Sequence, residues 1–256
     1  MDLQKYGPWA LIIGGSEGVG AAFARKLATA GFKLVLVARK PGPLQELTAE
    51  LTTHGTEVRT LSADMSQSDA VDRVRTVTDD VEVGLLIYNA GANSIRGDFV
   101  DLDPEVYRSV IGVTVIGQSE FAHHYGALMR QRGRGGIILC GSTSGYMGAP
   151  SLAAYTAAKA FSRILTEALW VECRAFGVDV LHLNIGFTAT PAMARLGYDL
   201  TAAQAPEEVA QQGLDNIANG PVLIAGGPAN LELAIKRSTV ENRAEAILAF
   251  ATPRRD

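Results

Sequence analysis

Cysteine is scarce in this sequence: Cys140 and Cys173 are the two cysteines among 256 residues. A single widely separated pair supplies neither a disulfide framework nor a clustered metal site. We therefore expect no bound metal and two buried, unreactive thiols.

Long apolar runs and strong charge of one sign are also missing. No stretch approaches the roughly 18 apolar residues that cross a bilayer, and the segment Met1–Pro8 has no apolar signal core. We therefore expect a cytoplasmic protein with no membrane partner. The formal net charge is −4 without a dense basic run, which argues against nucleic acid as a partner.

The composition that remains is that of a globular chain. Apolar residues make up 47% and charged residues 20%, a balance that excludes a disordered or fibrous protein. The length suits one large domain, and no linker or internal repeat divides it. We predict a single domain over residues 1–256.

Short apolar runs alternate with longer segments of helical period, the pattern of a parallel sheet covered on both faces. It predicts an α/β fold: a single-domain, doubly wound (Rossmann-like), seven-stranded parallel sheet with helices on both faces. The expected strands are Ala10–Gly14, Leu34–Ala38, Val58–Ser62, Leu85–Asn89, Gly136–Gly141, Val178–Asn184 and Val222–Ala225. The expected helices are Gly18–Ala30, Gly42–His54, Ser68–Val81, Pro104–Arg132, Ser151–Phe176, Pro206–Asn219 and one near Thr239–Ala251.

A glycine-rich turn joins the first strand to the first helix. It reads Gly14-Gly15-Ser16-Glu17-Gly18-Val19-Gly20, with the spacing GxxxGxG. Glycines there let the backbone approach a pyrophosphate, whose charge is favoured by free N–H groups at the helix N-terminus. The alternative is a turn that only allows close packing of strand and helix.

The end of the second strand bears on the choice of dinucleotide. Arg39 and Lys40 stand where an acid would accept hydrogen bonds from a free ribose 2′-hydroxyl. A guanidinium instead suits a 2′-phosphate, so Arg39 favours NADP(H), with NAD(H) as the alternative cofactor. Glu17 is counter-evidence because its charge would oppose that phosphate, and Arg39 also has the alternative of being a solvated surface residue.

Tyr155 and Lys159 lie four residues apart in the expected helix Ser151–Phe176, so they share one face. A neighbouring ammonium favours the phenolate and lowers the pKa of a tyrosine, which then serves as a general acid or base. Ser142 follows an apolar strand, at the edge where an open α/β sheet places its ligand. The alternatives are a half-buried Tyr beside a surface Lys and a Ser that bonds its own turn.

These motifs together resemble the short-chain dehydrogenase/reductase family over residues 8–226. Four features agree in order and spacing: the glycine turn, the Asn89-Ala90-Gly91 step, Ser142 thirteen residues before Tyr155, and Tyr155-x-x-x-Lys159. The resemblance implies that Tyr155 exchanges the proton, that Lys159 lowers the pKa of Tyr155 and bonds the nicotinamide ribose, and that Ser142 orients the carbonyl.

The resemblance also implies a set of cofactor contacts. Asp64 would contact the adenine, with helix capping as its alternative and Ser66 as its competitor for that cap. Asn89 has the alternative of only stabilising the end of its strand. The implied set is Gly14, Ser16, Glu17, Gly18, Val19, Gly20, Arg39, Asp64, Met65, Asn89, Ala90, Gly91, Tyr155, Lys159, Ile185, Gly186, Thr188 and Thr190.

Two positions depart from the family pattern. Thr114 stands where the family usually has an asparagine that supports a proton-relaying water, so we count Thr114 with the catalytic residues and expect an altered relay. Ile185 replaces a proline in the loop that grips the nicotinamide, and Gly186, Thr188 and Thr190 remain as contacts.

The segment 187–205 is apolar with few charges and falls where the family closes over its substrate, which predicts an apolar substrate pocket. The opening Tyr6-Gly7-Pro8-Trp9 resembles members that reduce long-chain 3-oxoacyl or steroid ketones. The leading hypothesis is therefore an NADP-preferring ketone reductase or alcohol dehydrogenase. The alternative is a catalytically weak nucleotide-binding sensor or scaffold.

Apolar residues on more than one face of Pro104–Arg132 and Ser151–Phe176 predict a homodimer or homotetramer.

Overall fold

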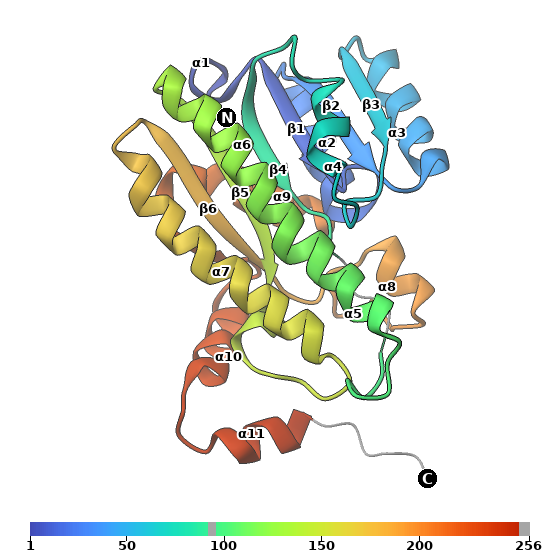
Figure 1. Cartoon of the computed structure of the whole chain (residues 1–256), viewed down its shortest axis with the longest axis vertical. Coiled ribbons are helices and arrows are strands. Elements are labelled where there is room, and N and C mark those ends of the chain that lie inside the picture. Colours follow the sequence, from blue (N-terminus) through green and yellow to red (C-terminus); the bar gives the residue numbers. More distant parts are fainter. Residues whose placement is uncertain (92–95, 251–256) are drawn as a thin grey trace.

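A seven-stranded parallel sheet forms the centre of the molecule (Figure 1). The computed structural model describes residues 1–91 and 96–250. The strand order is β3-β2-β1-β4-β5-β6-β7, and every neighbouring pair is parallel, which confirms the predicted doubly wound sheet. The strands are β1 (Trp9–Ile13), β2 (Lys33–Ala38), β3 (Val58–Ser62), β4 (Val83–Tyr88), β5 (Gly135–Ser142), β6 (Val178–Ile185) and β7 (Val222–Ile224).

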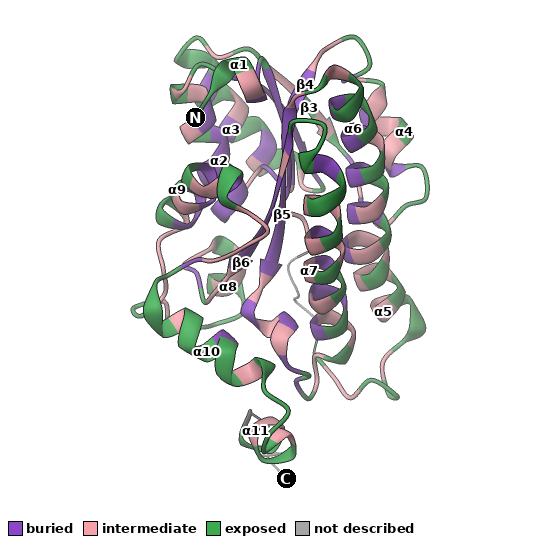
Figure 2. Ribbon diagram, turned by 90° about the vertical axis from the view of Figure 1, so that its left-hand side faces the viewer, coloured by how far each residue is buried: buried purple, intermediate pink, exposed green. Residues whose placement is uncertain are grey.

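The inner strands are apolar throughout because both of their faces are covered. Every residue of β1 is buried, and alternate residues enter different cores: Ile12 joins the cluster that holds Phe23, whereas Leu11 joins the one that holds Phe121. Figure 2 shows α2, α3 and α9 on one side of the sheet and α4 to α7 on the other. Both cysteines are free and buried, as expected.

The helices agree with the predicted pattern over most of the chain. They are α1 (Leu3–Tyr6), α2 (Gly18–Thr29), α3 (Pro41–Thr53), α4 (Ala70–Arg75), α5 (Pro104–Ile111), the π-helix η1 (Gly112–Gly117), α6 (Gln118–Arg132), the 3-10 helix η2 (Thr143–Tyr146), α7 (Ala153–Arg174), α8 (Pro191–Arg195), α9 (Pro206–Asn216), the 3-10 helix η3 (Ile217–Asn219), α10 (Pro228–Ser238) and α11 (Arg243–Phe250). The short helix α8 lies inside the segment expected to cover the substrate.

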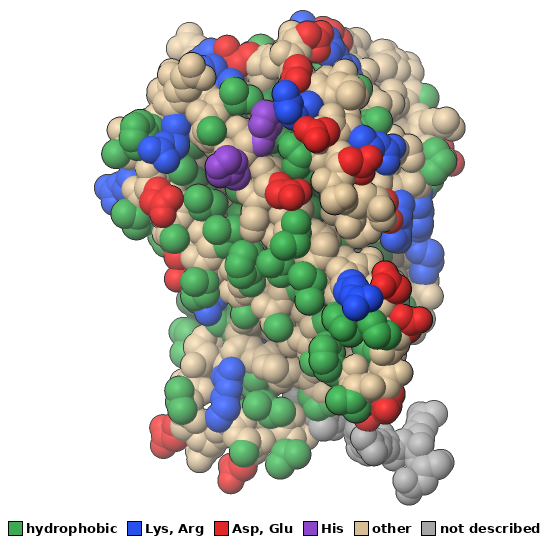
Figure 3. All heavy atoms as spheres, in the orientation of Figure 1, with side chains coloured by type: hydrophobic (Ala, Val, Ile, Leu, Met, Phe, Trp, Pro, Cys, Tyr) green, Lys and Arg blue, Asp and Glu red, His purple; other side chains and the backbone are tan. Residues whose placement is uncertain are grey.

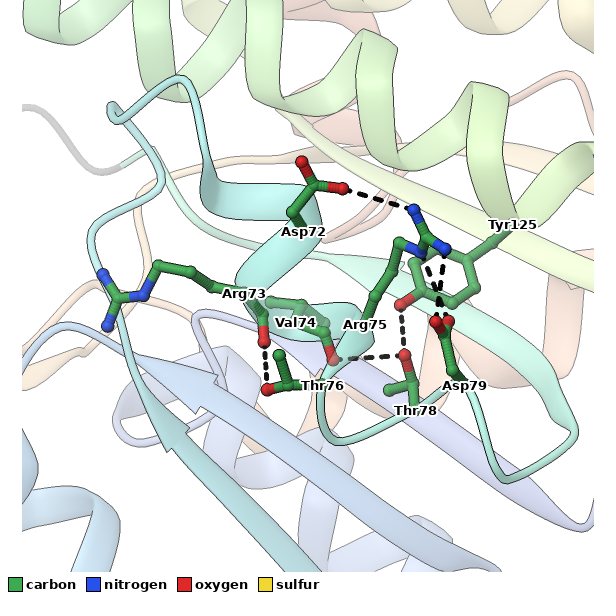
Figure 4. Close-up of polar contacts among 8 residues, drawn as sticks. All are labelled: Asp72, Arg73, Val74, Arg75, Thr76, Thr78, Asp79 and Tyr125. Carbon is green, nitrogen blue, oxygen red and sulfur yellow. Dashed lines mark hydrogen bonds and ion pairs between the residues drawn. The ribbon is translucent and has the colours of Figure 1, made fainter.

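Helix α4 is shorter than the predicted Ser68–Val81. Thr76 and Thr78 follow its last turn, and their hydroxyls donate to carbonyls of that turn, which offers the backbone an alternative to further helix (Figure 4). The Thr78 hydroxyl also lies 2.8 Å from the Tyr125 hydroxyl, so the segment is hydrogen-bonded to α6.

The predicted helix Pro104–Arg132 is interrupted by the π-helix η1. Thr114 and Gly117 are buried in this wider turn, and the Tyr88 hydroxyl donates to the carbonyl of Val113 at 2.6 Å. π-Turns inside helices are common at functional sites because they redirect side chains. Here the turn aims Thr114 at the end of β4.

Helix α10 was not predicted from the sequence. Helix α11 lies within the helix expected near Thr239–Ala251 but begins four residues later, and Ala251 lies outside the described residues. Arg237 donates to the Thr143 carbonyl and Arg243 to the Tyr146 carbonyl, so the C-terminal segment lies against η2. Within residues 1–91 and 96–250, none of the helices has the length and apolar character needed to cross a bilayer.

Candidate active site

The predicted site residues converge on one edge of the sheet because all seven strands run in the same direction. The carboxyl ends of β1, β4, β5 and β6 meet there: the glycine turn follows β1, Asn89 follows β4, Ser142 ends β5 and Gly186 follows β6. The chain order reverses at β1, which has β2 on one side and β4 on the other. Ligands of open α/β sheets bind beside such a reversal point.

The glycine turn has no room for side chains at its key positions. Gly14 adopts a φ of +80° and Gly18 a φ of +55°, backbone conformations that favour glycine. A Cβ atom on Gly20 would overlap the Gly14 carbonyl oxygen and lie 2.8 Å from Asn89 Nδ2. The Asn89 amide donates to that same carbonyl at 3.0 Å, so Asn89 does stabilise the end of its strand. The turn is thereby fixed against β4.

The N-terminus of α2 has the properties that a pyrophosphate requires. Glu17 occupies the N-cap position, but its side chain makes no capping hydrogen bond to the first turn of α2. The first N–H groups of a helix have no partner within the helix, and together with the helix dipole they favour a bound anion. The residues present therefore fit a dinucleotide phosphate at this turn.

The charge of Glu17 in the glycine turn is compensated by neighbouring cations. Its carboxylate accepts two hydrogen bonds from Arg195 of α8, at 2.8 and 2.9 Å, and lies 3.6 Å from Lys40 Nζ. The hydrogen bonds from Arg195, with help from Lys40, lower the pKa of Glu17. The expected repulsion of a 2′-phosphate is therefore reduced by two cations. No local pattern in the sequence had indicated a role for Arg195.

Arg39 is largely free for a ligand. Its side chain is 67% exposed, and its guanidinium lies 3.9 Å from Asp64. Asp64 Oδ1 accepts from the Ser66 N–H and hydroxyl at 2.9 Å, so it closes a local turn. Neither Asp64 nor Ser66 caps the next helix, because α4 begins later, after Asp69. Met65 beside it is buried.

Ser142, Tyr155 and Lys159 come together as predicted. The α7 helix places Tyr155 and Lys159 on one face, with Lys159 Nζ 5.8 Å from the centre of the Tyr155 ring. A hydrogen bond with Ser142 favours the ionised form of Tyr155. The Ser142 oxygen also accepts from the Ser144 N–H at 3.1 Å, so it stabilises its own turn as well.

The electrostatics of the pair differ from the expectation. Burial raises the pKa of Tyr155, and the hydrogen bond from Ser142 only partly opposes this rise. Burial also lowers the pKa of Lys159 to about 8, and Lys159 Nζ donates to the Cys140 carbonyl at 3.1 Å. Burial therefore outweighs the hydrogen bond from Ser142, and the pKa of Tyr155 is raised in this structure, where the sequence had predicted a lowering by Lys159.

Thr114 reaches the same place from η1. Gly91 has a φ of +116°, and a Cβ atom on it would lie 2.8 Å from Thr114 Oγ1 and 3.5 Å from Lys159 Nζ. The threonine hydroxyl is thus a polar neighbour of the lysine across one glycine. Ala90 packs against the neighbouring core.

The predicted cofactor contacts at the end of β6 and in the loop after it each have a different structural environment. Ile185 packs on the core and Gly186 lies against Gln204, while the Thr188 hydroxyl donates to the Gly186 carbonyl at 3.1 Å. The Thr190 hydroxyl caps α8 by accepting from the backbone N–H of Met193. The hydroxyls of both threonines therefore stabilise the loop itself.

The segment 187–205 presents apolar side chains to solvent. Phe187 and Tyr198 are about two-fifths exposed, and their rings are in edge-to-face contact at 5.8 Å. A separate cavity of about 640 Å³ lies between η2, the start of α7 and α11, with Tyr146, Arg163 and Ile247 among its lining. Neither Ser142 nor Tyr155 lines that cavity, so we assign it no part in the reaction.

Comparison with known proteins agrees with this geometry. A family model described as short chain dehydrogenase matches residues 8–200. The chain is 33% identical over 228 residues to a 7beta-hydroxysteroid dehydrogenase of Clostridium sardiniense, a match that covers 87% of each chain. A solved structure described as 7beta-hydroxysteroid dehydrogenase superposes with a TM-score of 0.89 at 31% identity, over 97% of this chain and 98% of that one. A short-chain dehydrogenase from Sphingobium yanoikuyae, solved in complex with NADPH, gives 0.80 at 27% identity, over 97% and 98%.

Proposed function

Because the chain belongs to the short-chain dehydrogenase family, we propose that it reduces an apolar ketone, or oxidises the matching secondary alcohol, with NADP(H) as its preferred cofactor. The observation that carries this proposal is the meeting of Ser142, Tyr155 and Lys159 at the sheet edge, beside an uncapped glycine turn. Phosphate binding and proton exchange are thereby available at one edge.

The chemistry assigned to the side chains is proton transfer and positioning. A bound nicotinamide supplies the hydride in reduction and accepts it in oxidation. In reduction, the Tyr155 hydroxyl gives its proton to the carbonyl oxygen, and in oxidation the phenolate takes the proton from the alcohol. The Ser142 hydroxyl hydrogen-bonds the substrate oxygen. The Lys159 ammonium and the Thr114 hydroxyl stabilise charge and return protons to Tyr155.

The NADP(H) preference follows from charge at the end of β2. Arg39 is exposed and its neighbour Lys40 is half-buried, and among residues 1–91 and 96–250 the ion pair of Arg39 is the 3.9 Å contact with Asp64. A 2′-phosphate gains charge-assisted hydrogen bonds from two such adjacent cations. The NADPH complex of the Sphingobium yanoikuyae relative is consistent with this preference.

For the substrate, we propose a bulky apolar ketone such as a steroid, with a 3-oxoacyl compound as the second class. The similarity to 7beta-hydroxysteroid dehydrogenases supports the steroid class. The exposed aromatic rings of Phe187 and Tyr198 suit a large apolar skeleton better than a small polar one.

We also propose that the chain forms a homodimer or homotetramer. Exposed apolar side chains follow α5, η1, α6 and α7 on one face of the molecule, where Figure 3 shows a band of hydrophobic surface. They are Ile111, Ile116, Leu128, Phe161, Ile164 and Val171. Continuous apolar surface of this kind is typical of subunit interfaces. Light scattering is expected to give two or four chains, and a monomer at all concentrations would reject the interface.

Substrate-dependent oxidation of NADPH tests the enzymatic proposal. Purified protein is assayed against a panel of steroid and 3-oxoacyl ketones, and Tyr155→Phe is the key variant because it removes only the hydroxyl. We expect turnover to fall by a factor of at least about 100 while NADPH affinity is retained. An active Tyr155→Phe enzyme would refute the assignment of the proton donor. Binding of NADPH without turnover of any ketone would favour the sensor or scaffold instead.

A further inference from the structure

We propose that Arg195 and Glu17 tie the flap, defined as residues 187–205, to the glycine turn, and that Arg195 thereby protects the NADP(H) preference from the charge of Glu17. The proposal rests on the proposed function because it assumes that a dinucleotide occupies the groove. It assigns Arg195 two roles, one mechanical and one electrostatic.

The flap is attached to the body of the protein at a narrow base. The Ala189 N–H donates to the Gln204 carbonyl at 2.8 Å, and the Gln204 N–H donates to the Phe187 carbonyl at 2.9 Å. Beyond this base, α8 contributes no buried residue. Packing alone therefore holds the outer part of the flap weakly, so its position depends more on side-chain contacts with the rest of the protein.

Two such contacts join the flap to other segments of the protein. Arg195 makes the bidentate pair with Glu17, and Tyr198 is hydrogen-bonded to Arg96, whose guanidinium also lies over its ring. Near the first contact the flap and the glycine turn are close together: a Cβ atom on Gly18 would lie 2.9 Å from Thr190 Cγ2. The ion pair therefore bridges a junction that is already in van der Waals contact.

Glu17 is shared between the flap and the site proposed for the 2′-phosphate. Arg195 approaches it to 2.8 Å and Lys40 to 3.6 Å, and Lys40 is the neighbour of Arg39. If Arg195 is removed, Glu17 retains its charge and turns to Lys40 as its remaining cation. Lys40 is then partly withdrawn from the phosphate, and the carboxylate repels the same phosphate. NADP(H) is penalised by both effects, whereas NAD(H) has no 2′-phosphate to lose.

Affinities for NADPH and NADH, measured by cofactor fluorescence, test the electrostatic role in wild type, Arg195→Gln, Glu17→Gln and the double variant. We expect Arg195→Gln to weaken NADPH binding about threefold to tenfold while NADH binding changes less than twofold. Adding Glu17→Gln to Arg195→Gln should restore NADPH affinity to at least the wild-type level, because the offending charge is gone. Equal losses for both cofactors, or no recovery in the double variant, would overturn the proposal.

Hydrogen exchange of the protein without cofactor tests the mechanical role. Glu17→Gln and Arg195→Gln should both speed amide exchange in peptides from residues 187–205. Glu50→Gln is the matched control, since Glu50 makes an equivalent bidentate pair with Arg25, at 2.7 and 2.8 Å, between α2 and α3. We expect it to leave the flap unchanged. Unchanged exchange in Glu17→Gln would overturn the tie.

These outcomes are separable from failure of the proposed function. A wild-type protein that binds neither NADPH nor NADH would contradict the dinucleotide site itself, and the exchange experiment would still report on the tie. A wild-type protein that prefers NADPH, together with an Arg195→Gln variant of unaltered preference, would contradict only the role given to Arg195. Arg195→Lys separates the two roles further: the charge is kept, so the preference should persist, while the lost bidentate geometry should speed exchange.

Discussion

Thr114 Oγ1 and Lys159 Nζ both lie beside Gly91 and come from different helices. Both lie within 3.5 Å of the position that a Cβ atom on Gly91 would occupy. A side chain at Gly91 would collide with the Thr114 hydroxyl and touch the Lys159 ammonium, so the glycine leaves room for both groups after the end of β4. We propose that Thr114 exchanges a proton with Lys159 from this position.

Replacing Thr114 by Val should lower kcat by about tenfold or more, because the variant keeps the shape of the side chain and removes the hydroxyl. Thr114→Ser is the control, since it keeps the hydroxyl and loses only a methyl group, and it should retain most of the activity. Steady-state kinetics with a saturating ketone measure both. If Val and Ser variants were equally active, Thr114 would have no part in proton exchange.

Lys159 should make stability rise with pH in the alkaline range. Its pKa in the fold is about 8, below the ordinary value of 10.5, because its side chain is only 4% exposed. Between these pH values the unfolded chain binds a proton that the folded chain lacks, so the free energy of unfolding increases with pH. The cost of burying the ammonium is fully present below pH 8 and is on the order of 3 kcal/mol.

Urea unfolding at pH 7.5 and pH 10 measures this effect, with Lys159→Met as the reference that cannot titrate. The wild type should gain more stability than the variant on going to the higher pH. Parallel behaviour of the two proteins would mean that Lys159 keeps its proton in the fold.

The sheet and most of the site were predictable because their signals are local. A buried parallel strand has a continuous apolar sequence, and the carboxyl ends of parallel strands meet at one edge of the sheet regardless of the loops that connect them. Topology placed Ser142 at that edge, and the resemblance to the short-chain dehydrogenase family joined it to Tyr155. The spacing of Tyr155 and Lys159 likewise determined their common helix face.

Other features depend on contacts that no local pattern encodes. Arg195 and Glu17 are 178 residues apart, and each is an ordinary charged residue in its own segment. The π-helix around Thr114 has the same apolar period as the helix predicted in its place. The pKa of Tyr155 was misjudged because the sequence displays the neighbouring ammonium but not the burial that opposes it.

The contact between Thr78 and Tyr125 should contribute measurably to stability. Both hydroxyls are buried and lie 2.8 Å apart (Figure 4), and burial raises the pKa of Tyr125 to about 12. Thr78→Val leaves the Tyr125 hydroxyl without this partner and should cost about 1–3 kcal/mol in urea unfolding. Adding Tyr125→Phe should recover part of that loss, since both polar groups are then gone. A double variant less stable than the sum of the single changes would contradict this pairing.

Arg39 should decide the cofactor preference directly. Arg39→Gln removes the guanidinium while keeping a polar side chain, and a lost charge-assisted contact to a 2′-phosphate is worth about 1.5–3 kcal/mol, or roughly tenfold or more in Kd. NADPH affinity should fall by that factor and NADH affinity should hardly change. Asp64→Asn is the companion variant: it removes the acid 3.9 Å from the guanidinium and should, if anything, strengthen NADPH binding. Equal affinity of the Arg39→Gln and wild-type proteins for NADPH would show that Arg39 is a solvated surface residue, and that any NADP(H) preference comes from Lys40.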